Sequence, residues 1–264
     1  MANGSALEIR NVSKRFDLGK GRSVTAVEGI TFNVEQNSIV VLLGPSGCGK
    51  STILRMMAGL ETPSAGEIVI GGRTVDGPAR DRGMVFQAYT SFDWLSVRKN
   101  VEFGMKINGV PAAKRRAQAE HFIKLVGLEK FADVYPSQLS GGMRQRVAIA
   151  RTLANDPEVL LMDEPFGALD AETRWLMQEL MVNVAEQTNT TMVIVTHDLE
   201  EAIFLADKIV FLSSHPGRVK EEIRPAFKAG KRIDDKEVVI KLDGYSDLEG
   251  HLMHLMREEG RGLE

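Results

Sequence analysis

The chain has 264 residues, 43% of them hydrophobic, which is enough to bury a substantial core in one large domain or in one domain with an inserted lobe. Its 33 basic and 36 acidic residues give a formal charge of -3, so the composition does not indicate general nucleic-acid binding and leaves only a local basic patch open. The single cysteine, Cys48, rules out an internal disulfide and fits a reducing compartment.

The sequence contains no obvious membrane segment. Residues 1–10 lack the apolar core of a signal peptide, and no apolar run approaches the ~18–20 residues needed to cross a bilayer. We therefore expect any membrane role to be peripheral, through a partner.

Two segments near the N-terminus, residues 7–12 and 24–34, alternate apolar and polar residues and predict half-buried strands. The polar, glycine-containing residues 17–23 predict the turn between them. Phe16 lies at the end of the first strand, where its ring could stack on adenine and contribute ~1–3 kcal/mol with little discrimination between bases. A core position for Phe16 is the open alternative.

The stretch G-P-S-G-C-G-K-S-T follows a predicted buried strand at residues 39–43 and precedes a predicted helix at 53–60. Its glycines allow a tight turn around an anion, and its backbone N–H groups and the helix dipole favour phosphate. Lys50 is expected to reach the β- and γ-phosphates, and Ser51 to offer its hydroxyl to Mg²⁺. The sequence therefore predicts a nucleoside triphosphate site at Gly44, Pro45, Ser46, Gly47, Cys48, Gly49, Lys50, Ser51 and Thr52.

Cys48 is placed at a helix N-terminus beside Lys50, and both features lower the pKa of a thiol. This position predicts a reactive cysteine that bound ATP protects from maleimide reagents. An inert, buried cysteine is the alternative.

Residues 66–70 and 83–86 predict two more strands, and Gln87 follows the second. A polar side chain at this strand end could reach the nucleotide, although a lone glutamine also suits a solvated loop. Residues 88–156 are polar and helix-rich, and they predict a helical lobe inserted into an α/β core. Residues 112–126 form the amphipathic helix of that lobe, with Ala117 on its apolar face.

A second helix start that could bind phosphate lies in the motif L-S-G-G-M, before a predicted helix at residues 144–154. Ser140 is of a residue type that caps helices, while Gly141 and Gly142 leave backbone N–H groups accessible to an anion. The same pattern also makes an ordinary capped turn.

Two adjacent carboxylates, Asp163 and Glu164, follow the apolar strand predicted at residues 159–162. A charge buried there needs a metal, a partner or a shifted pKa. One carboxylate is expected to hold Mg²⁺, and the other to orient or deprotonate an attacking water. Asp170 precedes a helix predicted at residues 171–187 and could simply be its cap.

Residues 192–196 predict another buried strand, followed by His197 and a helix at residues 198–206. A lone histidine at a strand end is usually structural. Ligands of open α/β sheets collect at the carboxyl ends of strands, however, and His197 would be a further functional group at that edge. The charged tail from residue 226 onward predicts one small amphipathic helix, with an apolar face formed by Leu248, Leu252, Leu255 and Met256.

Taken together, these motifs resemble the ATP-binding subunit of an ABC transporter over about residues 7–219. The phosphate loop is similar to the family's Walker A, residues 139–145 to its signature motif and residues 160–165 to its Walker B. The resemblance assigns catalysis to Lys50, Gln87, Glu164 and His197, the metal to Ser51, Gln87 and Asp163, and further nucleotide contacts to Phe16, Ser140, Gly141, Gly142 and Asp170.

The fold that this resemblance implies is α/β: a P-loop NTPase core with a mainly parallel sheet, an N-terminal antiparallel β subdomain and an inserted α-helical subdomain. Residues 1–264 would form a single ABC ATPase domain. Within it, residues 1–87 and 157–225 would be the nucleotide-binding core and residues 88–156 the helical subdomain. The tail, residues 226–264, matches no part of the family pattern beyond about residue 227.

The resemblance also implies a homodimer with two ATPs sandwiched head to tail. Each ATP would lie between the Walker A of one copy and Ser140, Gly141 and Gly142 of the other. ATP and Mg²⁺ are the expected cofactors, integral membrane permease subunits the direct partners, and a periplasmic or surface solute-binding protein an indirect one, with no nucleic acid. The expected location is the cytoplasmic face of the inner membrane, as a peripheral subunit.

Residues 196–207 and 215–219 resemble one importer branch, which handles nitrate, taurine or other sulfonates, bicarbonate and related solutes. Two features depart from the family: Phe16 stands where many relatives have tyrosine, and the proline common before Trp94 is absent. The alternatives are a different transport system or a soluble, non-transport ATPase of DNA repair or chromosome organisation. Those machines carry long coiled coils between phosphate loop and signature, which this chain lacks.

Overall fold

Two β-sheets organise the computed structural model, which describes residues 5–88 and 90–261. The smaller sheet is antiparallel, and its strands lie in the order β2 (Arg22–Glu35), β1 (Ser5–Gly19), β4 (Ala65–Ile70) and β5 (Arg73–Thr74). The larger sheet has the order β10 (Val219–Ile223), β9 (Lys208–Leu212), β3 (Ile39–Leu43), β8 (Thr191–Thr196), β7 (Val159–Asp163) and β6 (Arg82–Val85). All pairs of the larger sheet are parallel except β10 with β9. The predicted fold class is confirmed.

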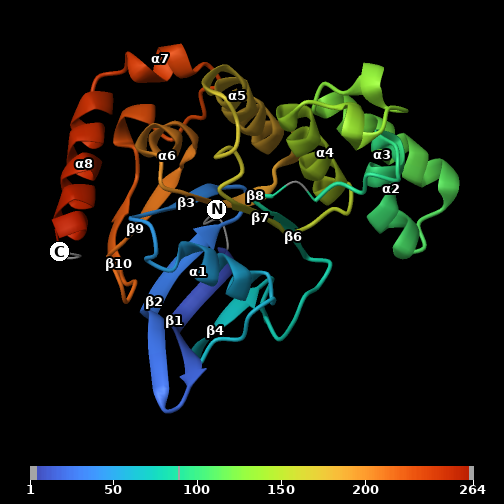
Figure 1. Cartoon of the computed structure of the whole chain (residues 1–264). Coiled ribbons are helices and arrows are strands. Elements are labelled where there is room, and N and C mark those ends of the chain that lie inside the picture. The colour runs from blue at the N-terminus through green and yellow to red at the C-terminus, as the bar shows by residue number, and fades with distance from the viewer. Residues whose placement is uncertain (1–4, 89, 262–264) are drawn as a thin grey trace.

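Strands β1 and β2 form one long hairpin that extends away from the rest of the molecule (Figure 1). The turn predicted at residues 17–23 is shorter than expected, because β1 continues to Gly19 and β2 begins at Arg22. Gly19, Lys20 and Gly21 all have positive φ angles. Glycine adopts this conformation readily, so two of the three turn positions carry no side-chain strain.

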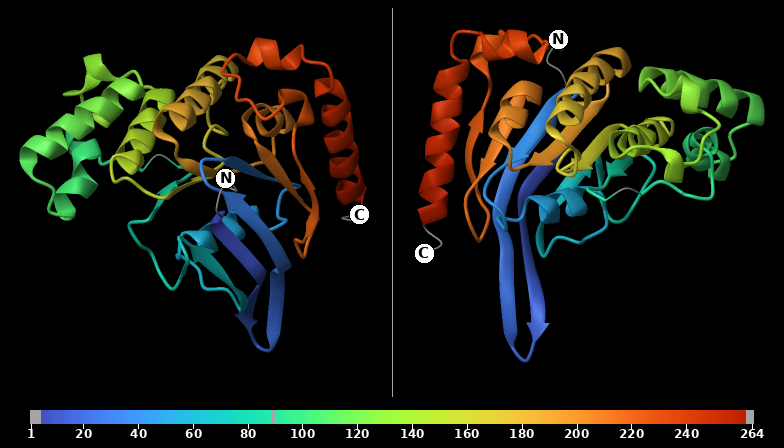
Figure 2. Two further views of the ribbon diagram at one scale, coloured as in Figure 1. Left: turned by 180° about the vertical axis from the view of Figure 1, so that it is seen from behind. Right: turned by 45° about the horizontal axis from the view of Figure 1, so that its top comes forward.

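The larger sheet separates two hydrophobic cores. Along β3 the side chains alternate between them: Ile39, Val41 and Leu43 face one core, and Val40 and Leu42 face the other. A strand buried on both faces reads as a continuous apolar run, which explains why β3, β7 and β8 were predictable. The first core is covered by helices, and the second by the smaller sheet and one helix (Figure 2). These helices are α1 (Lys50–Met57) on the second core, and α5 (Ala171–Thr188) and α6 (Leu199–Leu205) on the first.

The chain between β6 and β7 forms the predicted helical lobe, at one side of the larger sheet (Figure 1). It contains α2 (Val97–Ile107), α3 (Ala112–Leu125) and α4 (Gly141–Leu153). The buried face of α3 differs from the prediction, because Ala117 is exposed and Ala119 is buried together with Ile123. The two alanines are two residues apart and therefore lie on different sides of the helix.

The tail forms two helices, α7 (Lys236–Ile240) and α8 (Tyr245–Arg261). Helix α8 lies beside β10 at the outer edge of the larger sheet and packs on α6 (Figure 1). Its predicted apolar face is confirmed, since Leu252 and Leu255 are buried. In the part of the chain that the structure describes, no helix combines the length and apolar character needed to span a membrane.

Candidate active site

The carboxyl ends of four parallel strands lie along one edge of the larger sheet. In the register of this sheet, Leu43 pairs with Thr196, Asp163 with Val195, and Val85 with Met162. Each strand therefore ends within about one residue of its neighbour. The residues that follow these strands therefore lie at the same edge of the sheet: the phosphate loop, Glu164, Gln87 and His197.

The phosphate loop makes a tight turn between β3 and α1. Gly47 and Gly49 have φ angles of +82° and +95°, which only glycine adopts without strain. A Cβ at Gly49 would lie 2.3 Å from the Val27 side chain of β2, and a Cβ at Gly44 would lie 2.7 Å from the carbonyl oxygen of Leu212. Glycine is therefore required by conformation at Gly47, by space at Gly44, and by both at Gly49.

Lys50 points into this turn and is only 5% exposed. Its Nζ donates hydrogen bonds to the carbonyl oxygens of Gly44 at 2.7 Å and Pro45 at 2.8 Å. An ammonium held inside a glycine-rich turn at a helix N-terminus is the arrangement that binds a nucleotide's phosphates. The loop borders a cavity of about 250 Å³, lined by Ser46, Gly47, Gly49, Lys50, Ser51, Thr52 and Glu164.

Ser51 and Asp163 form an oxygen pair beside the loop. The Ser51 hydroxyl donates to Oδ1 of Asp163 at 2.8 Å. Burial raises the pKa of the Asp163 carboxyl, the hydrogen bond from Ser51 lowers it, and the neighbouring Glu164 raises it further. Magnesium in phosphate sites takes one or two protein oxygens of this kind and completes its coordination with phosphate and water. The hydroxyl of Ser51 and the carboxylate of Asp163 fit this donor set. Among residues 5–88 and 90–261, no group of three or more His, Cys, Asp or Glu side chains could hold a metal.

Glu164 is held between two side chains from other strands. Its Oε2 accepts a hydrogen bond from Nε2 of Gln87 at 3.3 Å, and its Oε1 lies 3.1 Å from Nδ1 of His197. Its φ of +42° is uncommon for a residue with a side chain, and its N–H is fixed by a hydrogen bond to the Val195 carbonyl at 3.0 Å. Three residues that are far apart in the sequence thus meet at the loop's cavity. Because the Gln87 amide is turned to Glu164, its expected metal contact remains a prediction.

The second glycine-rich helix start is not among the residues lining this cavity. Ser140 is confirmed as the N-cap of α4, since its Oγ accepts a hydrogen bond from the Met143 N–H at 3.4 Å. Gly142 packs so closely on α5 that a Cβ would lie 2.4 Å from Cγ2 of Thr173. Asp170 caps α5 by accepting from the Thr173 N–H at 3.0 Å, which lowers the pKa of Asp170. The motif and the α5 cap therefore form one unit, and their contacts with a nucleotide remain a prediction.

Phe16 is half-buried and belongs to neither hydrophobic core, so the core alternative is wrong. It pairs with Val24 on the hairpin, and Nζ of Lys14 lies 5.0 Å from the centre of its ring. Strand β2 contacts the phosphate loop at Val27. Phe16 therefore lies on β1, which pairs with the strand that contacts the phosphate loop. Its adenine-stacking role remains a prediction.

The reactive thiol expected at Cys48 is contradicted by the structure. Cys48 is 1% exposed and belongs to the second core, and burial raises the pKa of its thiol despite the opposing effect of Lys50. The cause is tertiary packing, because Cys48 lies in the second core together with distant residues such as Val27 and Leu212. The structure therefore favours the alternative interpretation, in which Cys48 is an inert, buried residue.

We expect maleimide to label Cys48 slowly in the folded protein at pH 7.5, because the raised pKa leaves little thiolate and the sulfur is covered. Labelling in 6 M urea should be complete within minutes, since unfolding exposes the thiol. Mass spectrometry over time measures both rates. Equal rates in the two conditions would contradict the burial of Cys48.

One buried acid near this site is not among the residues predicted from the sequence. Glu201 on α6 is 4% exposed, and burial together with the nearby Asp198 raises the pKa of its carboxyl to about 8. Its Oε2 accepts a hydrogen bond from Nε2 of the buried Gln178, and Arg174 lies close enough to lower the pKa in part. The spacing Asp198–Glu201, a helix cap followed three residues later by glutamate, was the signal that could have marked it.

The Glu201→Gln variant should become more stable than the wild type as the pH rises. The folded-state pKa of about 8 lies above the ordinary 4.5, so the folded wild type keeps a proton that the unfolded chain loses. The wild type therefore loses stability between about pH 4.5 and pH 8, on the order of a few kcal/mol, whereas a neutral amide does not titrate. Urea unfolding at pH 5.5 and 8.5 measures the difference, with Glu129→Gln on the surface as the control. The same stability difference at both pH values would show that Glu201 ionises normally.

Comparisons with known proteins agree with this geometry. Residues 27–167 match the family model described as ABC transporter. A nitrate import ATP-binding protein of Synechocystis is 48% identical over 217 residues, which are 82% of this chain and 81% of that protein. A taurine import ATP-binding protein of Jannaschia is 46% identical over 235 residues, 89% of this chain and 88% of that protein.

Two solved structures show the same fold. One is a dimeric ATP-binding cassette in a post-hydrolysis state with ADP and Pi bound, with a TM-score of 0.72 and 33% identity over 83% of this chain and 98% of that one. The other is cbiO1 from Clostridium perfringens, part of an ABC transporter complex, with a TM-score of 0.76 and 28% identity over 95% of this chain and 99% of that one. Together with the assembled site, these matches show that the chain belongs to the ABC transporter family, as an ATP-binding subunit whose ATP hydrolysis is coupled to transport.

Proposed function

We propose that two copies of this chain drive an importer of a small solute, with nitrate and the sulfonate taurine as the best-supported classes. The names and identities of the relatives support this choice. The observation that carries the proposal is the position of Glu164, which is bound by Gln87 and His197 at the cavity of the phosphate loop.

In this mechanism Glu164 is the general base that takes a proton from the attacking water. Lys50 neutralises charge on the γ-phosphate. His197 orients Glu164 and senses the γ-phosphate. Mg²⁺, held by Ser51 and Asp163, would neutralise charge on the phosphate oxygens when bound. Gln87 would connect this site to the helical lobe, because it lies two residues after the end of β6, where the lobe begins.

We also propose that each ATP is completed by a second copy of the chain. Helix α4 begins with the N-cap Ser140, and helix N-termini are sites that favour anions, yet α4 is absent from the residues that line its own copy's phosphate-loop cavity. A head-to-tail dimer places Ser140, Gly141 and Gly142 of one copy, with Asp170, against the nucleotide on the other. The dimeric cassette with ADP and Pi supports this arrangement.

The surface for the membrane permease is proposed at a groove between the lobe and the core. This groove has a volume of about 440 Å³ and is lined by Met84 of β6, by Phe92, Phe103 and Ile107 of the lobe, and by other residues. Ile107 is 71% exposed and Trp94, whose ring lies 5.3 Å from that of Phe92, is 72% exposed. Large apolar side chains left exposed beside a groove are typical of a protein interface.

We also propose the division of the chain, its location and its cofactors. The core would comprise residues 1–87 and 157–225, the helical subdomain residues 88–156, and the tail residues 226–264. The complex would lie on the cytoplasmic face of the inner membrane, with Mg²⁺ and ATP as cofactors. A periplasmic or surface solute-binding protein would deliver the solute and would not touch this chain.

Co-purification tests this proposal. A tagged chain extracted from its native membranes in mild detergent should retain an integral membrane protein, and its ATPase rate in vesicles should rise with nitrate or taurine in the presence of the solute-binding protein. Trp94→Asp should release the membrane protein, whereas Leu18→Asp, at the exposed tip of the hairpin, should not. Recovery of nucleic acid in place of a membrane protein would favour a non-transport ATPase.

A further inference from the structure

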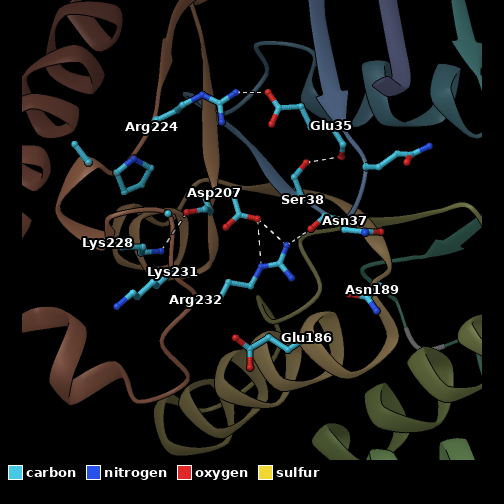
Figure 3. A pocket seen from close by; sticks show the side chains of 15 residues that line it. Glu35, Asn37, Ser38, Glu186, Asn189, Asp207, Arg224, Lys228, Lys231 and Arg232 are labelled. Atoms are coloured by element: carbon cyan, nitrogen blue, oxygen red, sulfur yellow. Dashed lines mark hydrogen bonds and ion pairs between the residues drawn. The ribbon is translucent and has the colours of Figure 1, made fainter. Parts of the chain in front are cut away.

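The tail crosses the edge of the larger sheet opposite the phosphate loop. There it lines a cleft of about 660 Å³, shown in Figure 3. Two ion pairs lie in this cleft: Arg224, just before the tail, pairs with Glu35, and Arg232 of the tail pairs with Asp207 at 2.8 Å. The Asp207 carboxylate also accepts a hydrogen bond from the N–H of Ile39, the first residue of β3. The cleft is thus the place where the tail is attached to the nucleotide-binding sheet.

A buried lysine of the tail holds the C-terminal end of α6. Lys228 is 7% exposed, and its Nζ donates to the carbonyl oxygens of Phe204 at 2.6 Å and Ala206 at 3.1 Å. Cations are stabilising at helix C-termini, where carbonyls lack partners. Burial lowers the pKa of Lys228 to about 8. Figure 3 shows this ammonium directed at the end of α6.

A second buried lysine reaches the N-terminal end of α6 through two polar side chains. Lys236 of α7 is 5% exposed, and its Nζ donates to Oε1 of Gln178 at 3.1 Å and lies 3.3 Å from Oε2 of Glu200. The buried Gln178 on α5 then donates from Nε2 to Glu201 at 3.3 Å. One amide group therefore links a cation of the tail to the first turn of α6.

This series of hydrogen bonds ends at the turn that carries His197. The Glu201 N–H donates to Oδ1 of Asp198 at 3.0 Å. Asp198 N–H in turn donates to the Thr196 hydroxyl at 3.0 Å. Between these two residues lies His197, whose Nδ1 is 3.1 Å from Glu164.

We propose that Lys236 is a positioning residue of the ATPase site, acting through Gln178 and Glu201 on the turn that carries His197. The tail then contributes to the rate of ATP hydrolysis. This inference rests on the proposed role of His197. Without the Lys236 ammonium, the buried oxygen of Gln178 has no donor from α7, so the amide is free to turn away from Glu201. Small displacements of a catalytic group lower rates strongly, up to about 10²-fold for about 1 Å.

The variant Lys236→Met tests the proposal in the full chain. Methionine retains an unbranched apolar side chain but removes the ammonium. We expect kcat for ATP hydrolysis to fall about tenfold, with KM for ATP within about twofold of the wild type. Lys241→Met, at the exposed end of the same helix, is the matched control and should behave as the wild type. A kcat for Lys236→Met equal to that of the control would overturn the proposal.

A double-mutant cycle with His197→Ala separates positioning from mere stability. If Lys236 acts through His197, its replacement should change the rate by less than about twofold once His197 is absent, measured in single turnovers with enzyme in excess. A tenfold loss that persists in the His197→Ala chain would show that Lys236 only stabilises the fold. Hydrogen exchange gives a second readout: amides of residues 196–205 should exchange faster in Lys236→Met than in Lys241→Met, and equal exchange would contradict the inference. If His197→Ala alone keeps the wild-type rate, the role of His197 itself is wrong.

Discussion

Replacing Glu164 by glutamine should lower the rate of ATP hydrolysis by about 10²–10⁴, the usual contribution of a general base. Glutamine has nearly the same shape and can still accept a hydrogen bond from Gln87, but it cannot take a proton from water. Binding of ATP should be unchanged, because the phosphate loop, Lys50 and Ser51 remain in place. The bound, unhydrolysed nucleotide should therefore hold the variant as a closed dimer.

Steady-state phosphate release and sedimentation with ATP measure the two effects. Glu129→Gln, an exposed carboxylate in the helical lobe, makes the same chemical change away from the site and should hydrolyse ATP normally. Wild-type turnover in Glu164→Gln would mean that another group activates the water.

Replacing Ser140 by aspartate should lower ATP hydrolysis by at least about 10²-fold. Aspartate caps a helix as well as serine does, so α4 keeps its N-cap. The new carboxylate would face the γ-phosphate of the partner copy's ATP, and two like charges about 4 Å apart cost about 4 kcal/mol at an effective dielectric constant of about 20.

Ser140→Asn is the matched control, because asparagine also caps helices but carries no charge. Its rate should stay within about tenfold of the wild type. Equal losses of rate in the two variants would show that the substitutions disrupt the N-terminus of α4. Wild-type rates in both variants would show that Ser140 does not contact the nucleotide.

Much of the nucleotide site was predictable because its chemistry depends on local sequence. The phosphate loop needs glycine at positions of positive φ, and the buried strands that precede Gly44, Asp163 and His197 read as apolar runs. Once these strands are parallel, their polar ends must meet at one edge. The meeting of Glu164, Gln87 and His197 follows from that topology.

The features that the sequence did not reveal depend on contacts between distant segments. Cys48 has the sequence neighbours of a reactive thiol, but it is buried in the second core together with distant residues such as Leu212. The left-handed backbone of Glu164 and the burial of Glu201 likewise depend on residues from other elements. The tail gave only an amphipathic pattern, whereas its two buried lysines find their partners on α5 and α6.

Mixing two inactive variants shows whether each nucleotide is bound between two copies of the chain. Lys50→Ala disables the phosphate loop and keeps Ser140, whereas Ser140→Asp keeps the loop. In a head-to-tail dimer of the two, one site receives both defects and the other receives none. The mixture should therefore hydrolyse ATP well above either variant alone, whereas wild-type chain mixed with the double variant Lys50→Ala/Ser140→Asp should form mixed dimers with no intact site. A mixture of the two single variants that stays as inactive as its components would contradict a site shared between copies.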